Sequence, residues 1–187
     1  MNGYRAPRWT LGSGAIGGNL QTIWPALFSR RFEGTPPAFE RERWATPDGD
    51  FIDVDFLRHA APLPADAPWL VLFHGLEGSS QSHYAQAFAH WSRTHGWTFA
   101  VPHFRGCSGE LNRAPRAYHS GDYEEIGWIL ERLRARSPAP LVAVGVSLGG
   151  NALLRWAEEA GDTAAPTARC IAAVSSPIDL AAGGYAI

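Results

Sequence analysis

The residues best suited to chemistry in this sequence are the serine and glycines at positions 145–149. They read Gly-Val-Ser-Leu-Gly, and a Gly-x-Ser-x-Gly pattern can present a serine hydroxyl on a sharp turn between a strand and a helix. The small glycines allow neighbouring backbone to approach such a strained turn. The pattern therefore predicts that Ser147 is a catalytic nucleophile. The alternative is an ordinary glycine-flanked turn between a strand and a helix.

A serine hydroxyl is a poor nucleophile at neutral pH, so it requires a base beside it and an acid that orients the base. In enzymes with this pattern, the acid and then the histidine follow the serine in the chain. Here Asp162 and Asp179 are the only aspartates after the serine, and the histidines all precede it, at positions 59, 74, 83, 90, 95, 103 and 119. Loss of the serine–histidine pair costs such hydrolases about 10⁶-fold in rate, roughly 8 kcal/mol of barrier. Without a recruited base, we expect this chain to be close to inert.

An acyl-transfer site also needs hydrogen-bond donors for the negative charge that develops on the carbonyl oxygen. One donor is expected to be the backbone N–H of the residue that follows the nucleophile, Leu148. The second should come from the loop after the apolar run 69–73, where we assign the backbone N–H of Leu76. Both donors belong to the main chain, so their placement depends on the fold.

The elements that would position the serine lie on either side of it. Residues 141–144 are a short apolar run with the β-branched residues of a buried parallel strand. Residues 151–159 favour a helix, with apolar side chains at 153, 154, 156 and 157, and Gly161 is a plausible end for it. The sequence thus predicts the order strand, tight turn, helix that the pattern requires.

The rest of the chain predicts an α/β fold, namely a mainly parallel sheet with helices on both faces, preceded by an antiparallel hairpin. The hairpin comprises residues 40–45 and 51–57 around a turn at 46–50. Further strands are expected at 69–73, 97–101 and 170–174. The two other helices are expected at 83–94, with Tyr84, Phe88 and Trp91 on one face, and at 122–136. We divide the chain into an extension, 1–38, that packs on the domain, and an incomplete domain, 39–187.

Composition narrows the possible partners and locations. An apolar content of 45% and a charged content of 18% are typical of an ordinary globular protein. The net charge of −2 does not favour nucleic acid or an anionic membrane surface as a partner. No run reaches the roughly 20 apolar residues of a membrane span, and the first 18 residues lack a signal-peptide core. We expect a cytoplasmic protein in which Cys107 and Cys170 are reduced, buried thiols, with no metal or organic cofactor.

The last expected strand, 170–174, is apolar on both faces, as strands with covered neighbours usually are. We expect no further strand or helix in the residues that follow it. The sheet would then have an open apolar edge, which favours self-association. We therefore expect this chain to be the N-terminal portion of a longer domain, without its C-terminal strands and helices.

Five motifs together resemble one family. Residues 18–23, 74–80, 103–110, 118–121 and 145–151 occur in the same order in the YheT-like branch of the α/β-hydrolase superfamily. That branch includes the animal ABHD proteins that act on esters and acylglycerols. The resemblance implies a carboxylic-ester hydrolase that acts on a small-molecule or lipid ester through an acyl-enzyme on Ser147, without a cofactor. Members have a longer C-terminal part that supplies the triad aspartate and histidine, and this sequence lacks it.

Several other polar residues have two readings. His74 is either a base or a residue that fixes the loop after a strand, and His119 either transfers protons or has a structural role; the structural reading is favoured for both. Arg105 either binds an anion or belongs to a hydrogen-bonded turn, and the turn is favoured. Cys107 has no base that would make it a nucleophile.

Two acidic residues and the function as a whole also have alternatives. Asp179 either replaces the triad acid or stabilises a loop, and the loop is favoured. Glu77 either holds a substrate or faces water. The alternative function is a catalytically inactive hydrolase-like domain that acts as a binding or scaffold module. A third possibility is an active short enzyme that uses an upstream histidine as its base.

Overall fold

Two antiparallel strands begin the sheet. The computed structural model describes residues 20, 23–24, 27–29 and 31–185. Most of the predicted extension, 1–38, and most of the motif at 18–23 lie outside these residues. Strand β1 (Phe39–Ala45) pairs with β2 (Phe51–Leu57) in antiparallel register. Gly49 in the connecting turn has φ +81°, a left-handed conformation that glycine adopts without steric cost. The predicted hairpin is confirmed.

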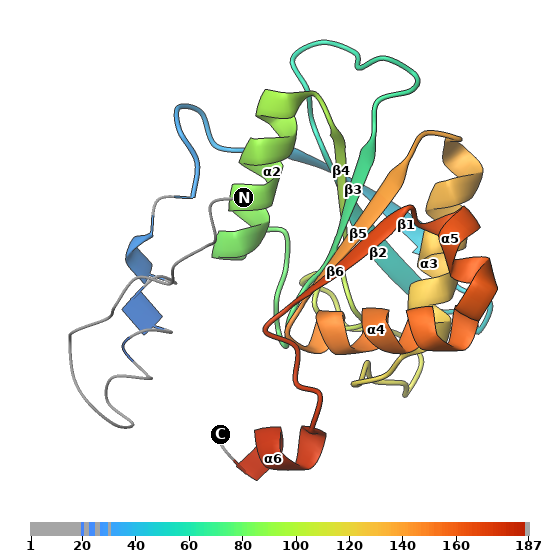
Figure 1. Ribbon diagram of the computed structural model, residues 1–187. Helices are drawn as coiled ribbons and strands as arrows, with labels where there is room; N and C mark the ends of the chain where they lie inside the picture. Colours follow the sequence, from blue (N-terminus) through green and yellow to red (C-terminus); the bar gives the residue numbers. More distant parts are fainter. Residues whose placement is uncertain (1–19, 21–22, 25–26, 30, 186–187) are drawn as a thin grey trace, which may run out of the picture.

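The sheet has six strands in the order β1-β2-β4-β3-β5-β6 (Figure 1). The last four strands along the chain are β3 (Trp69–Phe73), β4 (Thr98–Pro102), β5 (Leu141–Val146) and β6 (Cys170–Val174). These four run parallel to one another, and β2 joins them antiparallel to β4. Because their carboxyl ends lie at one edge of the sheet, the loops that follow them meet there. The expected mainly parallel sheet is confirmed.

Helices cover both faces of the sheet (Figure 1). Helices α3 (Tyr123–Arg136) and α4 (Leu148–Ala160) lie on one face, and α2 (His83–His95) lies on the other. Successive side chains of a strand point to opposite faces. In β3, Val71 and Phe73 accordingly join the core cluster under α3 and α4, whereas Leu70 and Leu72 join the cluster under α2. A short 3₁₀ turn (Gly161–Thr163) and α5 (Ala164–Thr167) connect α4 to β6.

No helix among the described residues has both the length and the apolarity needed to cross a membrane.

In α2, Tyr84 and Phe88 pack partly against the core, whereas Ala85 and Ala89 are fully buried and Trp91 is 41% exposed. Small residues allow the helix to pack close to the sheet, and its aromatic residues lie to the side, along an apolar groove.

Two expectations about local structure were wrong. Cys170 is exposed, because β6 lies at the edge of the sheet, and Cys107 is only half-buried. A further helix, α6 (Leu180–Tyr185), also follows β6.

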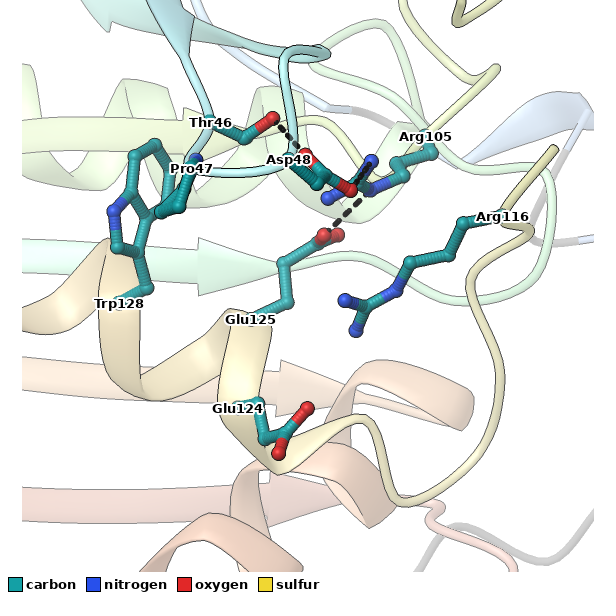
Figure 2. Close-up of a pocket in the computed structure, with 8 residues that line it drawn as sticks. All are labelled: Thr46, Pro47, Asp48, Arg105, Arg116, Glu124, Glu125 and Trp128. Carbon is teal, nitrogen blue, oxygen red and sulfur yellow. Dashed lines mark hydrogen bonds and ion pairs between the residues drawn. The ribbon is translucent and has the colours of Figure 1, made fainter. Parts of the chain in front are cut away.

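A buried ion network joins the hairpin turn to α3 at the carboxyl edge of the sheet. The Arg105 guanidinium donates to Glu125 at 2.7 Å and to both Asp48 and Asp50 at 2.8 Å. Its side chain is 4% exposed. Figure 2 shows Arg105, Asp48 and Glu125 at a cavity of about 160 Å³, with Arg116 pointing into the space beside Glu125. Nε and Nη1 of Arg105 are bonded to carboxylates, which favours the reading of Arg105 as part of a hydrogen-bonded structure over the reading as an anion site.

We expect Arg105→Ala to lower the free energy of unfolding by about 3 kcal/mol or more, because it leaves buried Glu125 and Asp50 without a counter-charge. Urea denaturation would measure the change. Arg155→Ala is the control, since Arg155 pairs with Glu158 and Glu159 at the surface of α4, and its loss should cost no more than about 0.5 kcal/mol. Equal losses in the two variants would contradict a structural role for the network.

Candidate active site

Ser147 occupies the turn between β5 and α4 in a strained backbone conformation. Its φ is +51° and its ψ −117°, a region that residues with a side chain rarely adopt. Two backbone hydrogen bonds hold the turn: the Ser147 N–H donates to Val174 O at 2.8 Å, and its carbonyl accepts from the Asn151 N–H at 3.0 Å. The order strand, sharp turn, helix is therefore present, as the pattern predicts. No hydrogen bond to the Ser147 hydroxyl is formed within the described part of the chain.

The glycines of the turn are required by close contacts between backbone segments. A Cβ at Gly149 would lie 2.4 Å from the carbonyl oxygens of both Phe73 and His74, at the end of β3. A Cβ at Gly145 would lie 2.4 Å from the Gly150 Cα. Neither gap admits even a methyl group. The start of α4 consequently packs directly against the end of β3.

The loop after β3 lies beside the serine. A Cβ at Gly75 would be 3.3 Å from the Ser147 Cβ. The Gly75 carbonyl accepts from the Gly78 N–H at 3.0 Å and lies 2.7 Å from His74 Nδ1. In a trans peptide the N–H points away from the carbonyl, so these bonds also fix the direction of the Leu76 N–H.

The two amides assigned to the oxyanion hole are both available. Within the described residues, neither the Leu76 N–H nor the Leu148 N–H donates a hydrogen bond. For Leu148 this follows from its position, because the first N–H groups of a helix have no partner in the helix. Free, fixed N–H groups beside a serine are what an oxyanion hole requires. Their assignment as donors stays a prediction.

His74 fixes the loop through both of its ring nitrogens. Its Nε2 accepts from the Phe104 N–H at 3.0 Å, which places the ring proton on Nδ1, facing the Gly75 carbonyl. The side chain is fully buried, and burial lowers the pKa of His74 to about 4. The ring is therefore neutral at pH 7 and has no free lone pair with which to act as a base. The structure supports the reading that this residue fixes the loop.

The remaining candidates also have structural partners. The exposed His119 ring lies 2.8 Å from the Ser120 carbonyl. Burial raises the pKa of the Cys107 thiol, which disfavours the thiolate. Asp179 accepts from the Ala182 N–H in the first turn of α6, which agrees with loop stabilisation. Glu77 bonds to Tyr118. Among the described residues, no histidine is hydrogen-bonded to Ser147.

A buried carboxylate that sequence reasoning missed holds the far end of the same loop. Asp55 Oδ2 accepts from Ser80 Oγ at 2.6 Å and lies 2.9 Å from His103 Nε2, and Arg41 Nε donates to Oδ1 at 2.7 Å. Burial opposes ionisation of Asp55, but these donors outweigh it and hold its pKa well below the usual range. The available signal was the pair of aspartates, Asp53 and Asp55, inside an otherwise apolar strand.

Comparison with known proteins places this geometry among hydrolases. The family model described as the alpha/beta hydrolase fold matches residues 68–183. The esterase candidate YheT of Escherichia coli K12 is 44% identical over 171 residues, which are 89% of this chain and 48% of that protein. Human phospholipase ABHD3 is 31% identical over 67% of this chain and 32% of its own length. The monoacylglycerol lipase of Saccharomyces cerevisiae is 30% identical over 64% of this chain and 27% of its own length. The chain thus spans less than half the length of these relatives.

Solved structures agree in fold. Mouse alpha/beta hydrolase domain-containing protein 10 superposes with a TM-score of 0.58 at 15% identity, over 79% of this chain and 54% of that one. A bacterial brefeldin A esterase superposes with a TM-score of 0.52 at 18% identity, over 78% and 42%. At these identities the likeness supports the fold alone.

We expect Gly149→Ala to destabilise the protein by about 3 kcal/mol or more, because the new methyl group would overlap two backbone carbonyl oxygens. Thermal or urea denaturation would measure the loss. Gly184→Ala is the matched control, since nothing lies within 4 Å of a Cβ there, and its stability should not fall by more than about 0.5 kcal/mol. A stable Gly149→Ala variant would show that α4 does not need to contact the end of β3.

The His74 ring should stay neutral down to about pH 5, since burial holds its pKa near 4. Between pH 6.5 and pH 4 the unfolded chain binds more protons at this site than the folded chain does. Stability contributed by His74 should therefore fall with pH, by about 3 kcal/mol over that range. NMR of the imidazole nitrogens would report the titration, with His74→Asn used to assign the signals. A midpoint at or above pH 6.5 would contradict the proposed hydrogen bonding.

Proposed function

This chain belongs to the α/β-hydrolase family, and we propose that its Ser147 is the nucleophile of a carboxylic-ester hydrolase. The observation that carries the proposal is the strained backbone of Ser147, which has a positive φ directly after β5. The adjoining Leu148 amide and the Leu76 amide of the neighbouring loop are both without partners in the described part of the chain. The relatives carry the names esterase candidate, phospholipase and monoacylglycerol lipase, all of which denote hydrolysis of ester bonds, and this supports the same bond as substrate here.

The reaction proceeds in two halves on the serine. In the first, Ser147 Oγ attacks the ester carbonyl carbon, its proton passes to a base, and the carbonyl oxygen becomes an anion that the Leu76 and Leu148 amides stabilise. Collapse of this intermediate breaks the C–O bond, and the alcohol leaves with the proton from the base. In the second half, water attacks the acyl-enzyme and releases the carboxylic acid and the free serine. No metal or organic cofactor takes part.

The proposal requires a base, which in this family is a histidine later in the chain than the serine. This sequence has no histidine after Ser147. Two of the upstream histidines, His74 and His103, are held in buried hydrogen bonds away from the Ser147 hydroxyl. The 187-residue chain alone should therefore hydrolyse esters about 10⁶-fold more slowly than a protein with a complete triad.

The substrate class follows from the surroundings of the serine and from the relatives. The Leu76 side chain is 66% exposed on the loop beside Ser147, where it would contact an apolar acyl group. This supports a short-chain carboxylesterase or an acylglycerol-lipase-like enzyme acting on small-molecule or lipid esters. The two free cysteines fit a cytoplasmic location.

A second candidate is a hydrolase-like domain that binds an ester or acid without turnover. The observation in its favour is the Ser147 hydroxyl, which has no hydrogen-bond partner within the described part of the chain. Such a domain would keep the oxyanion amides and the apolar contact at Leu76, and would lack the base and the acid that orients it.

The test uses the gene product as the cell makes it, assayed with p-nitrophenyl butyrate and with a fluorophosphonate probe. Ser147→Ala should lower kcat by about 10⁶-fold and abolish labelling. Ser137→Ala, at the end of α3 on the opposite edge of the sheet, is the control and should change neither.

Hydrolysis that survives Ser147→Ala would overturn the proposal. A folded wild-type gene product that neither hydrolyses the ester nor reacts with the probe would instead support the binding domain. Labelling of the isolated 187-residue chain would show that an upstream histidine serves as the base.

A further inference from the structure

We infer that Tyr118 is a positioning residue, whose hydroxyl holds the turn 75–78, and with it Leu76, in the conformation that presents a free amide beside Ser147. The inference rests on the proposed function for its catalytic meaning, because the oxyanion role of Leu76 is part of that proposal. The structural part of the inference does not depend on the proposed function, because it concerns only the shape of the turn 75–78 and the contact with Tyr118 that maintains this shape.

The turn has a residue in an unfavourable position. The Gly78 N–H donates to the Gly75 carbonyl at 3.0 Å, which closes a four-residue turn. Its third residue, Glu77, has φ +54°. A turn with positive φ only at this position is of type II, in which glycine or asparagine is usual. A glutamate there pays a steric cost that glycine does not, so other contacts must hold the turn in this conformation.

Tyr118 supplies such a contact. Its hydroxyl accepts from the Glu77 N–H at 3.0 Å and donates to the Glu77 carboxylate, also at 3.0 Å. Both bonds are made by the strained residue itself. This N–H belongs to the central peptide of the turn. In a type I turn, φ at this position is negative and the central peptide is rotated by about 180°. The bond to Tyr118 therefore selects the observed form.

The hydroxyl of Tyr118 is itself held in place by the core. The Tyr118 ring stacks on Phe104 with centroids 5.3 Å apart and planes within 4°. Phe104 stacks in turn on Phe73 at the end of β3, and its N–H donates to His74. Tyr118 thus joins the loop after β4 to the loop after β3. If the turn opened to relieve the strain at Glu77, the Gly78–Gly75 bond that fixes the direction of the Leu76 N–H would be lost.

Hydrogen exchange of the Gly78 amide tests this without any turnover, because that amide reports closure of the turn. Tyr118→Phe keeps the ring and removes the hydroxyl, and should speed exchange at Gly78 about 10-fold. Tyr123→Phe is the control, since the Tyr123 hydroxyl makes no hydrogen bond within the described part of the chain, and exchange should not change. Adding Glu77→Gly to Tyr118→Phe should restore slow exchange, because glycine adopts positive φ without the steric cost.

A steady-state assay of the gene product links the turn to catalysis. Tyr118→Phe should lower kcat for p-nitrophenyl butyrate about 10-fold with KM unchanged, and Glu77→Gly should restore it. Unchanged exchange at Gly78, or exchange that Glu77→Gly does not slow, would overturn the inference. Altered exchange with unchanged kcat in an active enzyme would overturn the link to catalysis. Absence of hydrolysis in the wild type would count against the proposed function alone, and the exchange result would still decide the role of Tyr118.

Discussion

The contact between the start of α4 and the end of β3 determines how the candidate site is built. A Cβ at Gly149 would overlap the carbonyl oxygens of Phe73 and His74, so the helix can approach the strand this closely only because a side chain is absent. The approach brings the Leu148 amide, at the first turn of α4, towards the loop that carries Leu76. Two strands, one helix and one loop thus meet at a point where their main chains touch. The oxyanion donors proposed here are products of that contact, and side-chain identity contributes little to them.

Buried charges fix the loops around this point. Asp55 binds Ser80 in the loop after β3 and His103 in the loop after β4, and Arg105 binds Glu125 of α3. Each network joins segments that are far apart in the sequence. Because a buried charge without its partner is costly, these loops can leave their positions only at a large energetic cost. A rigid surround of this kind is what preorganised donors require.

Much of the fold could be predicted because its signals are local. The strand 170–174 appears at the predicted residues and the helix after 122 begins within one residue of the prediction, since continuous apolar runs and helical periodicity are written in short segments. Which residues of α2 are buried could not be read from apolarity alone: Ala85 and Ala89 are fully buried and Trp91 is 41% exposed, because small side chains allow the helix to approach the sheet. The Asp55 network could not be predicted for a different reason: its members are up to 62 residues apart, and no local pattern relates them. The roles of Ser147, Leu76 and Leu148 stay predictions.

Backbone strain is concentrated at the carboxyl ends of the parallel strands. Among the described residues, the positive φ values outside glycine belong to Glu77, Ser147 and Ser175. Ser147 and Ser175 directly follow β5 and β6, and Glu77 lies four residues after β3. Each such residue costs about 1–2 kcal/mol, and a fold selected only for stability would place glycine there. The strain at Ser147 is offset by its hydrogen bond to Val174, and that at Glu77 by Tyr118. Backbone strain of this kind clusters at functional sites, and the shape maintained at these three adjacent strand ends is a half-buried serine beside two unpaired amides.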